Sequence, residues 1–321
     1  MSNITYLESI VIGALQGVSE LFPVSSLGHS VLVPKLIGGQ WAKDLDMAVP
    51  NSPYLSLLVA MHLATAIALI VFFWSDWVRI IAGLFRSIRI RKIDNPDARL
   101  GWLLIVATIP VGVAGLALHK VITNYLSGPI TTSIFLAVNG GILFMAERLR
   151  SGYEEENEDV RGRANMNATT IQFSTEDTIV LATTPAEVAS DVRLSRLGWR
   201  KATIIGAAQI LALMPGISRS GSTMAAGLFR GLRHEDSARF SFLLSTPVIL
   251  AAALLEVPKL FTPANQGLLG PALAGSVVAG IAAYFSVRFL TSYFETRTLT
   301  PFAIYCGFAG LGCLAYFSVA G

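Results

Sequence analysis

The stretch that decides the fold is QGVSELFPVSSLGHS, Gln16 to Ser30, and it recurs without a gap as QILALMPGISRSGST, Gln209 to Thr223. The offset between the copies is 193 residues in a chain of 321. Each copy interrupts an apolar segment with proline, glycine and hydroxyl residues. Polar and charged side chains at hydrocarbon depth are costly unless they face one another or a water-filled cavity. We therefore predict an internal duplication whose two copies share one polar site.

Composition indicates an integral membrane protein. Hydrophobic residues make up 53% and charged residues 14% of the chain, with a mean hydropathy of +0.59, whereas soluble domains carry about 25% charged residues. The two cysteines, Cys306 and Cys313, have neither a disulfide framework nor a metal-binding spacing. The segment MSNITYLES lacks the features of a cleaved leader, so we expect it to belong to the mature chain. Neither a soluble domain nor cysteine chemistry is expected.

Six apolar stretches have the roughly 20 residues that a membrane-spanning helix needs. They lie near residues 54–74, 101–119, 130–147, 238–257, 269–290 and 301–319. Two others, Tyr6 to Ile37 and Lys201 to Leu232, are broken in the middle by proline, glycine and serine. Non-helical backbone at membrane depth is tolerated only where protein or a wet cavity surrounds it. The sequence therefore predicts an all-α polytopic membrane protein with six transmembrane helices and two re-entrant helical hairpins.

One hairpin and three spans form each predicted half, residues 1–150 and 198–321, with a linker at 151–197. Because three spans is an odd number, the second half enters from the opposite face, which makes an inverted-topology repeat. The linker holds EEENED at 154–159 and a stretch rich in Ser, Thr, Asn and Ala. This composition is typical of a solvated segment, so we expect a cytoplasmic linker without chemistry.

The basic residues support the inverted repeat. Of the 24 lysines and arginines, nineteen fall in loops predicted to share one side, four fall on the other side, and one, Arg219, lies inside the second motif. Lysine and arginine accumulate in cytoplasmic loops. Both ends of the chain are therefore predicted to lie outside the cytoplasm.

The first motif gathers polar side chains on one helix face and in the break that follows it. Residues four apart in a helix share a face, and this places Gln16 beside Glu20, ahead of three further groups in the break: Ser25, Ser26 and His29. The amide and the serines could serve helix packing alone, but an idle buried Glu20 or His29 would be expensive. His62 and His119 lack such polar neighbours in the sequence and are expected to be structural.

The second motif contributes a positive charge, Arg219. Its planar guanidinium suits phosphate oxygens, and a helix break that served packing alone would leave this charge unpaired. Backbone N–H groups at the start of a half-helix favour an anion as well. The neighbours expected to contribute hydrogen bonds are Ser218, Ser220, Gly221 and Thr223.

QGVSELFPVSSLGH and PGISRSGST resemble the two signature regions of the BacA-type undecaprenyl-pyrophosphate phosphatase family, and TPFAIY at 300–305 resembles its last helix. The resemblance spans nearly the whole chain. It implies a bacterial plasma-membrane enzyme that hydrolyses undecaprenyl pyrophosphate to the monophosphate and phosphate, recycling the lipid carrier of cell-wall peptidoglycan synthesis. It also implies bacitracin resistance when the protein is abundant. Two positions depart from the pattern: Gln16 stands at an acidic position, and Cys306 stands where arginine is common.

The resemblance and the residues together predict a catalytic set of Glu20, Ser26, His29 and Arg219. Arg219 is expected to clamp the phosphates, and Glu20 with Gln16 to hold a divalent cation, Mg²⁺ or Ca²⁺. His29 is the acid/base candidate. Ser26 is either a hydrogen-bond donor to the substrate or a nucleophile that His29 activates. The predicted substrate-binding residues are Gln16, Ser25, Ser218, Ser220, Gly221 and Thr223.

A polyprenyl-phosphate transporter is the alternative function, because inverted repeats with broken helices are a transporter design. The predicted acid/base pair favours hydrolysis, since passive carriage needs none. The expected partners are a prenyl pyrophosphate lipid and membrane lipid, without nucleic acid, and a homodimer is left open. The site is expected to open to the extracytoplasmic side of the bacterial plasma membrane.

Overall fold

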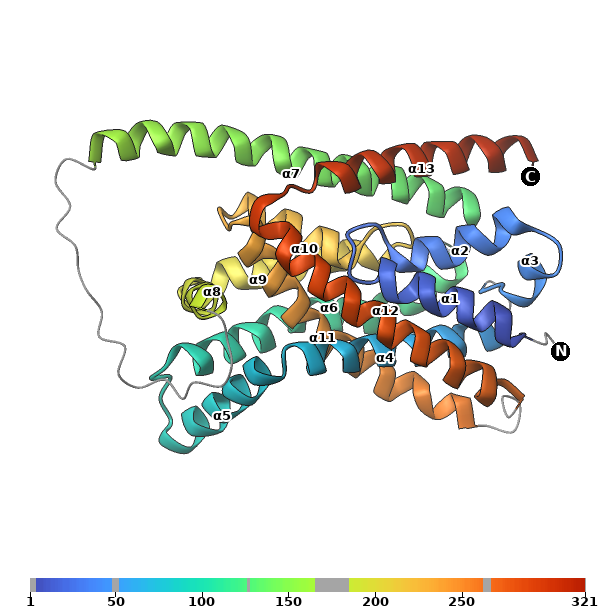
Figure 1. Ribbon diagram of the computed structural model, residues 1–321, viewed down its shortest axis with the longest axis horizontal. Coiled ribbons are helices and arrows are strands. Elements are labelled where there is room, and N and C mark those ends of the chain that lie inside the picture. The colour runs from blue at the N-terminus through green and yellow to red at the C-terminus, as the bar shows by residue number, and fades with distance from the viewer. Residues whose placement is uncertain (1–3, 48–51, 126–127, 165–184, 262–266, 321) are drawn as a thin grey trace.

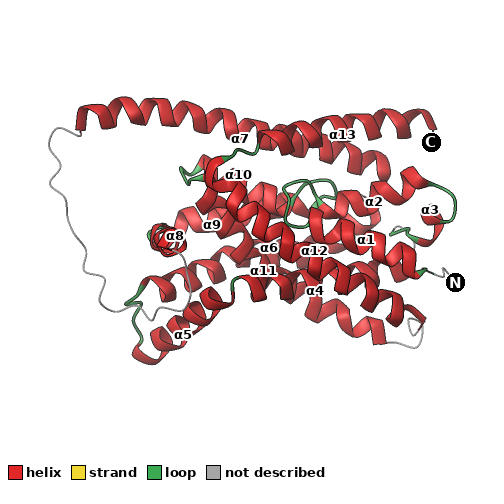
Figure 2. Ribbon diagram, viewed as in Figure 1, coloured by secondary structure: helices red, strands yellow, loops and turns green. Residues whose placement is uncertain are grey.

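The computed structural model describes residues 4–47, 52–125, 128–164, 185–261 and 267–320, and every regular element in these ranges is a helix (Figures 1 and 2). Within them, six helices are long and apolar enough to cross a membrane. These are α4 (Pro53–Phe72), α6 (Pro96–Tyr125), α7 (Pro129–Ala164), α11 (His234–Glu256), α12 (Leu269–Thr296) and α13 (Thr300–Ala320). The prediction of an all-α protein with six spanning helices is confirmed.

The first motif folds as two short helices around an irregular break. α1 (Tyr6–Ser19) and α2 (Ser26–Ile37) have 14 and 12 residues, fewer than the roughly 20 that span a bilayer. A capping box begins α1, because the Thr5 hydroxyl accepts from the Glu8 N–H while the Glu8 carboxylate accepts from the Thr5 N–H. The predicted interruption of this segment is therefore present, and its re-entrant placement in a membrane stays a prediction.

The second motif is interrupted at the corresponding place. α9 (Trp199–Ala207) continues into the 3-10 helix η1 (Ala208–Leu213), and α10 (Arg219–Phe229) begins after the break. Gly216, in the break, has a φ of 110°, and an added Cβ there would overlap the Thr132 carbonyl oxygen. Only glycine fits this position. Figure 2 shows the interrupting loops in the middle of the bundle rather than at its ends.

Each predicted half packs its first helix against a spanning helix of the other half. Gly13 of α1 lies against Gly275 of α12, and Gly206 of α9 lies against Ala107 of α6, so closely that an added Cβ would overlap the facing carbonyl oxygen in both places. Gly13 and Gly206 have the same 193-residue offset as the motifs. Two related repeats would pack against each other in this reciprocal way. Their inverted orientation in a membrane stays a prediction.

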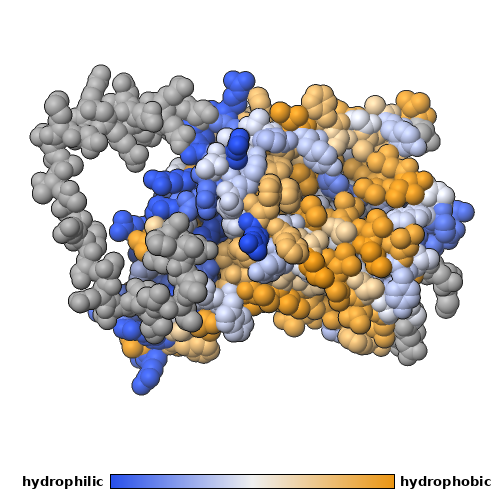
Figure 3. Space-filling view, viewed as in Figure 1, coloured by the Kyte–Doolittle hydropathy of each residue, from blue (hydrophilic) through white to orange (hydrophobic). Residues whose placement is uncertain are grey.

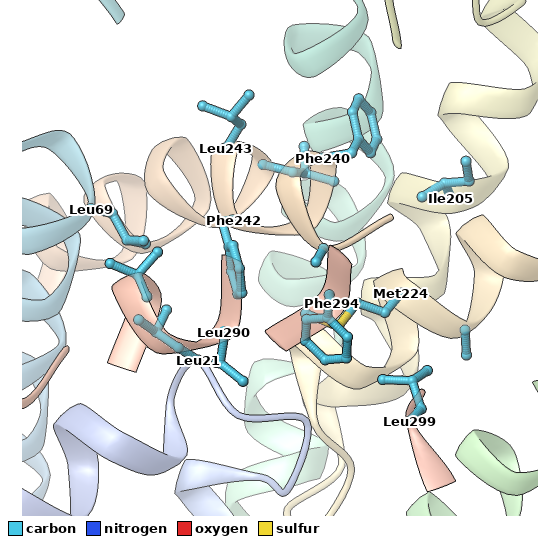
Figure 4. Close-up of a cluster of buried hydrophobic side chains, with 14 of the residues drawn as sticks. Leu21, Leu69, Ile205, Met224, Phe240, Phe242, Leu243, Leu290, Phe294 and Leu299 are labelled. Atoms are coloured by element: carbon cyan, nitrogen blue, oxygen red, sulfur yellow. The ribbon is translucent and has the colours of Figure 1, made fainter. Parts of the chain in front are cut away.

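The hydrophobic core anchors both motifs. Leu21, next to Glu20 in the first break, and Met224 of α10 are buried in one cluster with Phe242 of α11 and Leu290 of α12 (Figure 4). Truncating a buried leucine to alanine typically costs about 2–5 kcal/mol. Burial of Leu21 therefore holds the break, and with it the backbone of Glu20, against the centre of the bundle.

Two segments that we expected to be loop or linker are partly helical. α5 (Trp74–Ile90) fills much of the basic segment 75–100, α7 runs on to residue 164, and α8 (Pro185–Ser195) ends the linker. Asp191 of α8 is buried, and its carboxylate lies 2.7 Å from Arg79 Nη2 and 2.8 Å from Arg239 Nε. This end of the linker is thus bound to the helical bundle by ion pairs, the expectation of a cytoplasmic linker without chemistry stays a prediction, and residues 165–184 lie outside the described ranges. Two short helices complete the fold, α3 (Trp41–Asp44) and η2 (Val257–Phe261).

The surface is divided between a hydrophilic end and an apolar middle. Figure 3 shows hydrophilic side chains gathered at the end of the molecule where α5 and α8 lie in Figure 1, beside a broad hydrophobic surface. Large apolar side chains on the spanning helices are more than half exposed, among them Leu116, Phe285 and Phe308. Apolar faces of this extent fit a lipid environment. The chain is a multi-pass membrane protein.

Candidate active site

The first half of the site is built on a strained serine. Ser25 has φ 71° and ψ 98°, a conformation that costs a residue with a Cβ roughly 1–3 kcal/mol. Its hydroxyl accepts from the Gly28 N–H at 3.1 Å and so caps α2. Its carbonyl oxygen lies 2.7 Å from His29 Nδ1. These bonds fix the direction in which the first turn of α2 presents Ser26 and His29.

The second half begins in the same way. Ser218 is the N-cap of α10, and its hydroxyl accepts from the Gly221 N–H at 3.1 Å. The Ser220 hydroxyl lies 3.0 Å from the Ser218 hydroxyl and donates to the Phe22 carbonyl oxygen at 3.2 Å, which links the two breaks. Arg219 is the first residue of α10, so the cap sets the point from which its side chain reaches toward the first motif.

Asn139 of α7 holds the two breaks together. Its Nδ2 donates to the Pro23 carbonyl oxygen at 3.0 Å, and its Oδ1 accepts from the Ser218 N–H at 3.0 Å. Backbone groups that a helix break releases must find partners when they are buried, and this fully buried amide supplies one on each side. Sequence reasoning missed Asn139, whose only signal was an isolated amide in the apolar run 130–147.

Glu20 is the centre of the polar cluster. Its Oε1 lies 2.8 Å from Arg219 Nη2. Its Oε2 accepts from Ser26 Oγ at 2.5 Å and from Gln16 Nε2 at 2.9 Å, and His62 Nε2 lies 3.2 Å away. Glu20 is only 6% exposed, and a buried carboxylate needs such compensation. The two motif copies therefore meet at an ion pair between Glu20 and Arg219.

His62 of α4 belongs to this cluster, and the expectation that it lacks polar neighbours was wrong. Its Nδ1 lies 2.7 Å from the Leu58 carbonyl oxygen, which can only accept, so Nδ1 carries a proton and Nε2 is directed at Glu20. Helix periodicity within one segment could not reveal this contact, because Glu20 and His62 belong to different segments. The side chain of His119 lies outside the described part of the structure.

His29 is held on both sides of its ring. Because Nδ1 donates to the Ser25 carbonyl oxygen, Nε2 is the acceptor for the Tyr305 hydroxyl at 2.7 Å. The two rings stack with their centroids 5.7 Å apart. Tyr305 lies in the TPFAIY segment of α13, and no spacing in the sequence predicts its pairing with His29. Ser26 bonds to Glu20 instead of His29, so the predicted activation of Ser26 by His29 would require this arrangement to change.

The predicted catalytic residues thus fall into one neighbourhood. Gln16, Glu20, Ser26 and Arg219 form a single hydrogen-bonded cluster, and His29 lies one turn of α2 beyond Ser26. The other predicted substrate-binding residues are buried, and each already has a bond or close contact within the protein: Ser25, Ser218, Ser220, Gly221 and Thr223. Their part in substrate binding stays a prediction.

Gln16 and Glu20 also offer oxygen ligands. Gln16 Oε1 is buried and has no hydrogen-bond partner among the described residues, while the Nε2 of the same amide donates to Glu20. The described ranges hold no group of three His, Cys, Asp or Glu side chains arranged for a metal. Mg²⁺, however, keeps several waters and is commonly bound by one or two carboxylates together with substrate phosphates. The donor set fits the predicted divalent cation.

The fold and this cluster define a polytopic membrane protein whose two broken motifs meet at a buried carboxylate and guanidinium. The family model described as Bacitracin resistance protein BacA matches residues 9–312, and the chain belongs to this family. It is 52% identical over 318 residues to an undecaprenyl-diphosphatase of Mycolicibacterium paratuberculosis, with 99% of each chain covered. It is also 46% identical to undecaprenyl-diphosphatase 1 of Frankia casuarinae, covering 99% of this chain and 100% of the relative. Undecaprenyl-diphosphatase 2 of Burkholderia thailandensis is 42% identical, with 96% of this chain and 95% of the relative covered. The predicted family is confirmed.

Proposed function

We propose that this protein hydrolyses undecaprenyl diphosphate to undecaprenyl phosphate and inorganic phosphate, which returns the lipid carrier to cell-wall synthesis. Family membership and the names of the relatives support this function. The observation that carries it is the ion pair at 2.8 Å between Glu20 of the first motif and Arg219 of the second. A guanidinium binds phosphate oxygens through two parallel N–H groups, and an adjoining carboxylate can hold a cation or accept a proton. Lipid transport alone would leave the set of Glu20, Ser26 and His29 without a chemical task.

Arg219 provides the electrostatic part of the mechanism. Phosphoryl transfer passes through a loose transition state whose charge spreads over the peripheral oxygens, so clamping those oxygens lowers the barrier. The Arg219 guanidinium, now paired with Glu20, exchanges that partner for the terminal phosphate when substrate binds. The phosphorus gains a bond to the attacking oxygen and loses its bond to the bridging oxygen, which leaves with the lipid phosphate.

His29 and Glu20 are the groups that accept protons in the proposed reaction. His29 keeps its proton on Nδ1, bonded to the Ser25 carbonyl oxygen, and so presents an unprotonated Nε2 where the Tyr305 hydroxyl now lies. If water attacks directly, Nε2 accepts its proton and Ser26 donates to the phosphate. If Ser26 attacks first, its proton passes to Glu20, which already accepts it at 2.5 Å, and water then releases phosphate from the serine. Replacing Ser26 separates these routes.

The proposal includes a divalent cation held by Glu20 and Gln16. Such a cation, when bound, neutralises negative charge on the diphosphate. Gln16 supplies a neutral oxygen where the family pattern has an acid, so Glu20 carries the charge of this ligand pair. His62, directed at the same carboxylate, limits the orientations that Glu20 can adopt.

We further propose that the site opens to the extracytoplasmic side of the bacterial plasma membrane, with both termini on that side. The asymmetry of the basic residues supports this orientation, and both chain ends lie opposite the hydrophilic end (Figures 1 and 3). Cysteines placed at Asn95 and Asn157 should resist an impermeant thiol reagent in intact cells, while one at Asn51 should react. Labelling of Asn95 and Asn51 from the same side would contradict the inverted repeat. Whether the protein is a homodimer is decided by its mass in detergent.

The function is tested by phosphate release from undecaprenyl diphosphate by the purified protein in detergent. We expect release in the presence of Mg²⁺ or Ca²⁺, and a loss of release with excess chelator that added metal restores. Arg219→Gln should lose at least about a hundredfold in phosphate release, whereas Arg86→Gln, which removes an exposed arginine paired only with Asp94 among the described carboxylates, should match the wild type. A monodisperse wild-type protein that releases no phosphate with either metal would refute the proposal.

A further inference from the structure

A basic pocket of about 440 Å³ lies where the chain passes from α8 to α9, and it includes none of the residues of the candidate active site. Its walls carry four cationic side chains and one indole: Arg193, Arg196, Arg200, Lys201 and Trp199. This density of positive charge has no role in the proposed hydrolysis.

Only one of the four cations is neutralised within the described protein. Arg193 is fixed by Asp236, whose carboxylate oxygens lie 2.8 Å from Nε and 2.6 Å from Nη2. Arg196, Arg200 and Lys201 are exposed and form no ion pair with any carboxylate that the structure describes. The pocket therefore has one cation held by Asp236 and three exposed cations without a carboxylate partner among the described residues.

The start of α9 adds to this positive charge. Its N-cap is Gly198, which has no side chain to accept the first N–H groups, and its first turn contains Arg200 and Lys201 but no acidic residue. The N-terminal end of a helix is electropositive and favours negative charge. α1 meets this requirement with Glu8 in its capping box. The first turn of α9 has no carboxylate of its own, which makes it suited to an external anion.

The neighbouring apolar groups indicate where that anion comes from. Trp199 is 41% exposed, and Ile204, further along α9, is 43% exposed. Tryptophan concentrates at the boundary between headgroups and acyl chains, and basic pockets between membrane helices on the cytoplasmic side bind lipid headgroups.

We propose that the α8–α9 pocket binds the phosphate of an anionic phospholipid. Arg196, Arg200 and Lys201 contact the headgroup, Trp199 lies at its level, and Ile204 contacts the acyl chain. The site is separate from the site of hydrolysis and does not depend on the proposed reaction.

The test is native mass spectrometry of the full-length protein released from micelles that contain phosphatidylglycerol and phosphatidylcholine in equal amounts. The wild type should retain phosphatidylglycerol in preference to phosphatidylcholine. The triple variant R196Q/R200Q/K201Q removes three contacts to the bound headgroup, at about fivefold each, and should lose about a hundredfold in apparent affinity. The matched control R89Q/R91Q/K92Q removes three exposed cations at the end of α5 and should lose less than about threefold.

A second arm distinguishes lipid from free phosphate. Millimolar inorganic phosphate, compared with chloride at equal ionic strength, should leave the retained phosphatidylglycerol in place. The proposal is overturned if phosphate strips the lipid, if the wild type retains both lipids equally, or if the two triple variants lose phosphatidylglycerol to the same extent. Phosphate release measured on the same samples reports separately on the candidate active site.

Discussion

The two motif copies are alike in how they start a helix. Ser25 and Ser218 each cap the helix after the break and accept the N–H of the glycine three residues on, both at 3.1 Å. Gln16 and Gln209 are both buried, and the Oε1 of each lacks a hydrogen-bond partner among the described residues. The shared scaffold is therefore a capped half-helix with a buried amide on the helix before it.

The copies differ in charge. At the 193-residue offset, the carboxylate of Glu20 corresponds to the apolar Leu213, and the hydroxyl of Ser26 corresponds to the guanidinium of Arg219. His29 corresponds to Ser222. The first copy thus holds the acidic and titratable groups, and the second holds the permanent cation. Neither copy alone has both signs of charge, so the site requires the two to meet.

The largest loss should follow removal of the acid from the first copy. Glu20→Gln eliminates the negative partner of Arg219 and the charged ligand of the proposed cation, so phosphate release should fall about a thousandfold, the upper range for loss of one electrostatic group. Leu213→Glu added to this variant should not restore activity, because it places the acid in the wrong copy. Recovery to within tenfold of the wild type would show that the copies are interchangeable.

The second largest loss should follow Arg219→Lys. Lysine keeps the charge but loses the planar pair of N–H donors, so we expect turnover to fall about a hundredfold. Steady-state phosphate release measures this change, and a loss below tenfold would mean that charge alone suffices in the second copy.

Ser26→Ala tests which group of the first copy attacks phosphorus. Direct attack by water predicts a reduced but measurable rate, with a loss of about a hundredfold for one transition-state donor. A serine nucleophile predicts no turnover in the variant and a phosphoserine in the wild type. Rapid quenching followed by peptide mass spectrometry decides between them, and a phosphorylated Ser26 peptide would exclude direct attack by water.

The fold and half of the site could be predicted because their signals lie within single stretches of sequence or in the direct alignment of two stretches. Long apolar runs predicted the six spans, Pro23 and Gly216 marked the breaks, and the gapless alignment predicted that the two motifs share one site. The residues that were missed, His62 and Asn139, are single polar side chains in apolar helices. The role of such a side chain depends on its contact with another helix, and the residue spacing within its own helix does not predict that contact.

Asn139→Ala should affect both copies together, because it removes one bond to each break. Leaving the Pro23 carbonyl oxygen and the Ser218 N–H unpaired should cost about 1–3 kcal/mol for each buried group. The thermal midpoint in detergent should therefore fall, and phosphate release should fall with it below that temperature. If the variant is destabilised but its phosphate release is unchanged, the two hydrogen bonds of Asn139 contribute to stability alone.

The smallest expected effect compares the caps. Ser218→Ala should lower the free energy of unfolding by about 1 kcal/mol, the usual contribution of a serine cap. Ser25→Gly should cost less, because glycine relieves the strain at φ 71° while losing the cap. Denaturant or thermal unfolding of both variants measures the difference, and an equal or larger loss at Ser25 would contradict strain at that residue.

The central claim is that the Glu20 carboxylate of one copy and the Arg219 guanidinium of the other act as a unit. A double-mutant cycle on phosphate release tests it, with the wild type, Glu20→Gln, Arg219→Gln and the double variant. Groups that act together are strongly non-additive. The account predicts that the double variant is no more impaired than the worse single variant, to within about tenfold. Losses that multiply across the cycle would contradict it, because the two copies would then contribute independently.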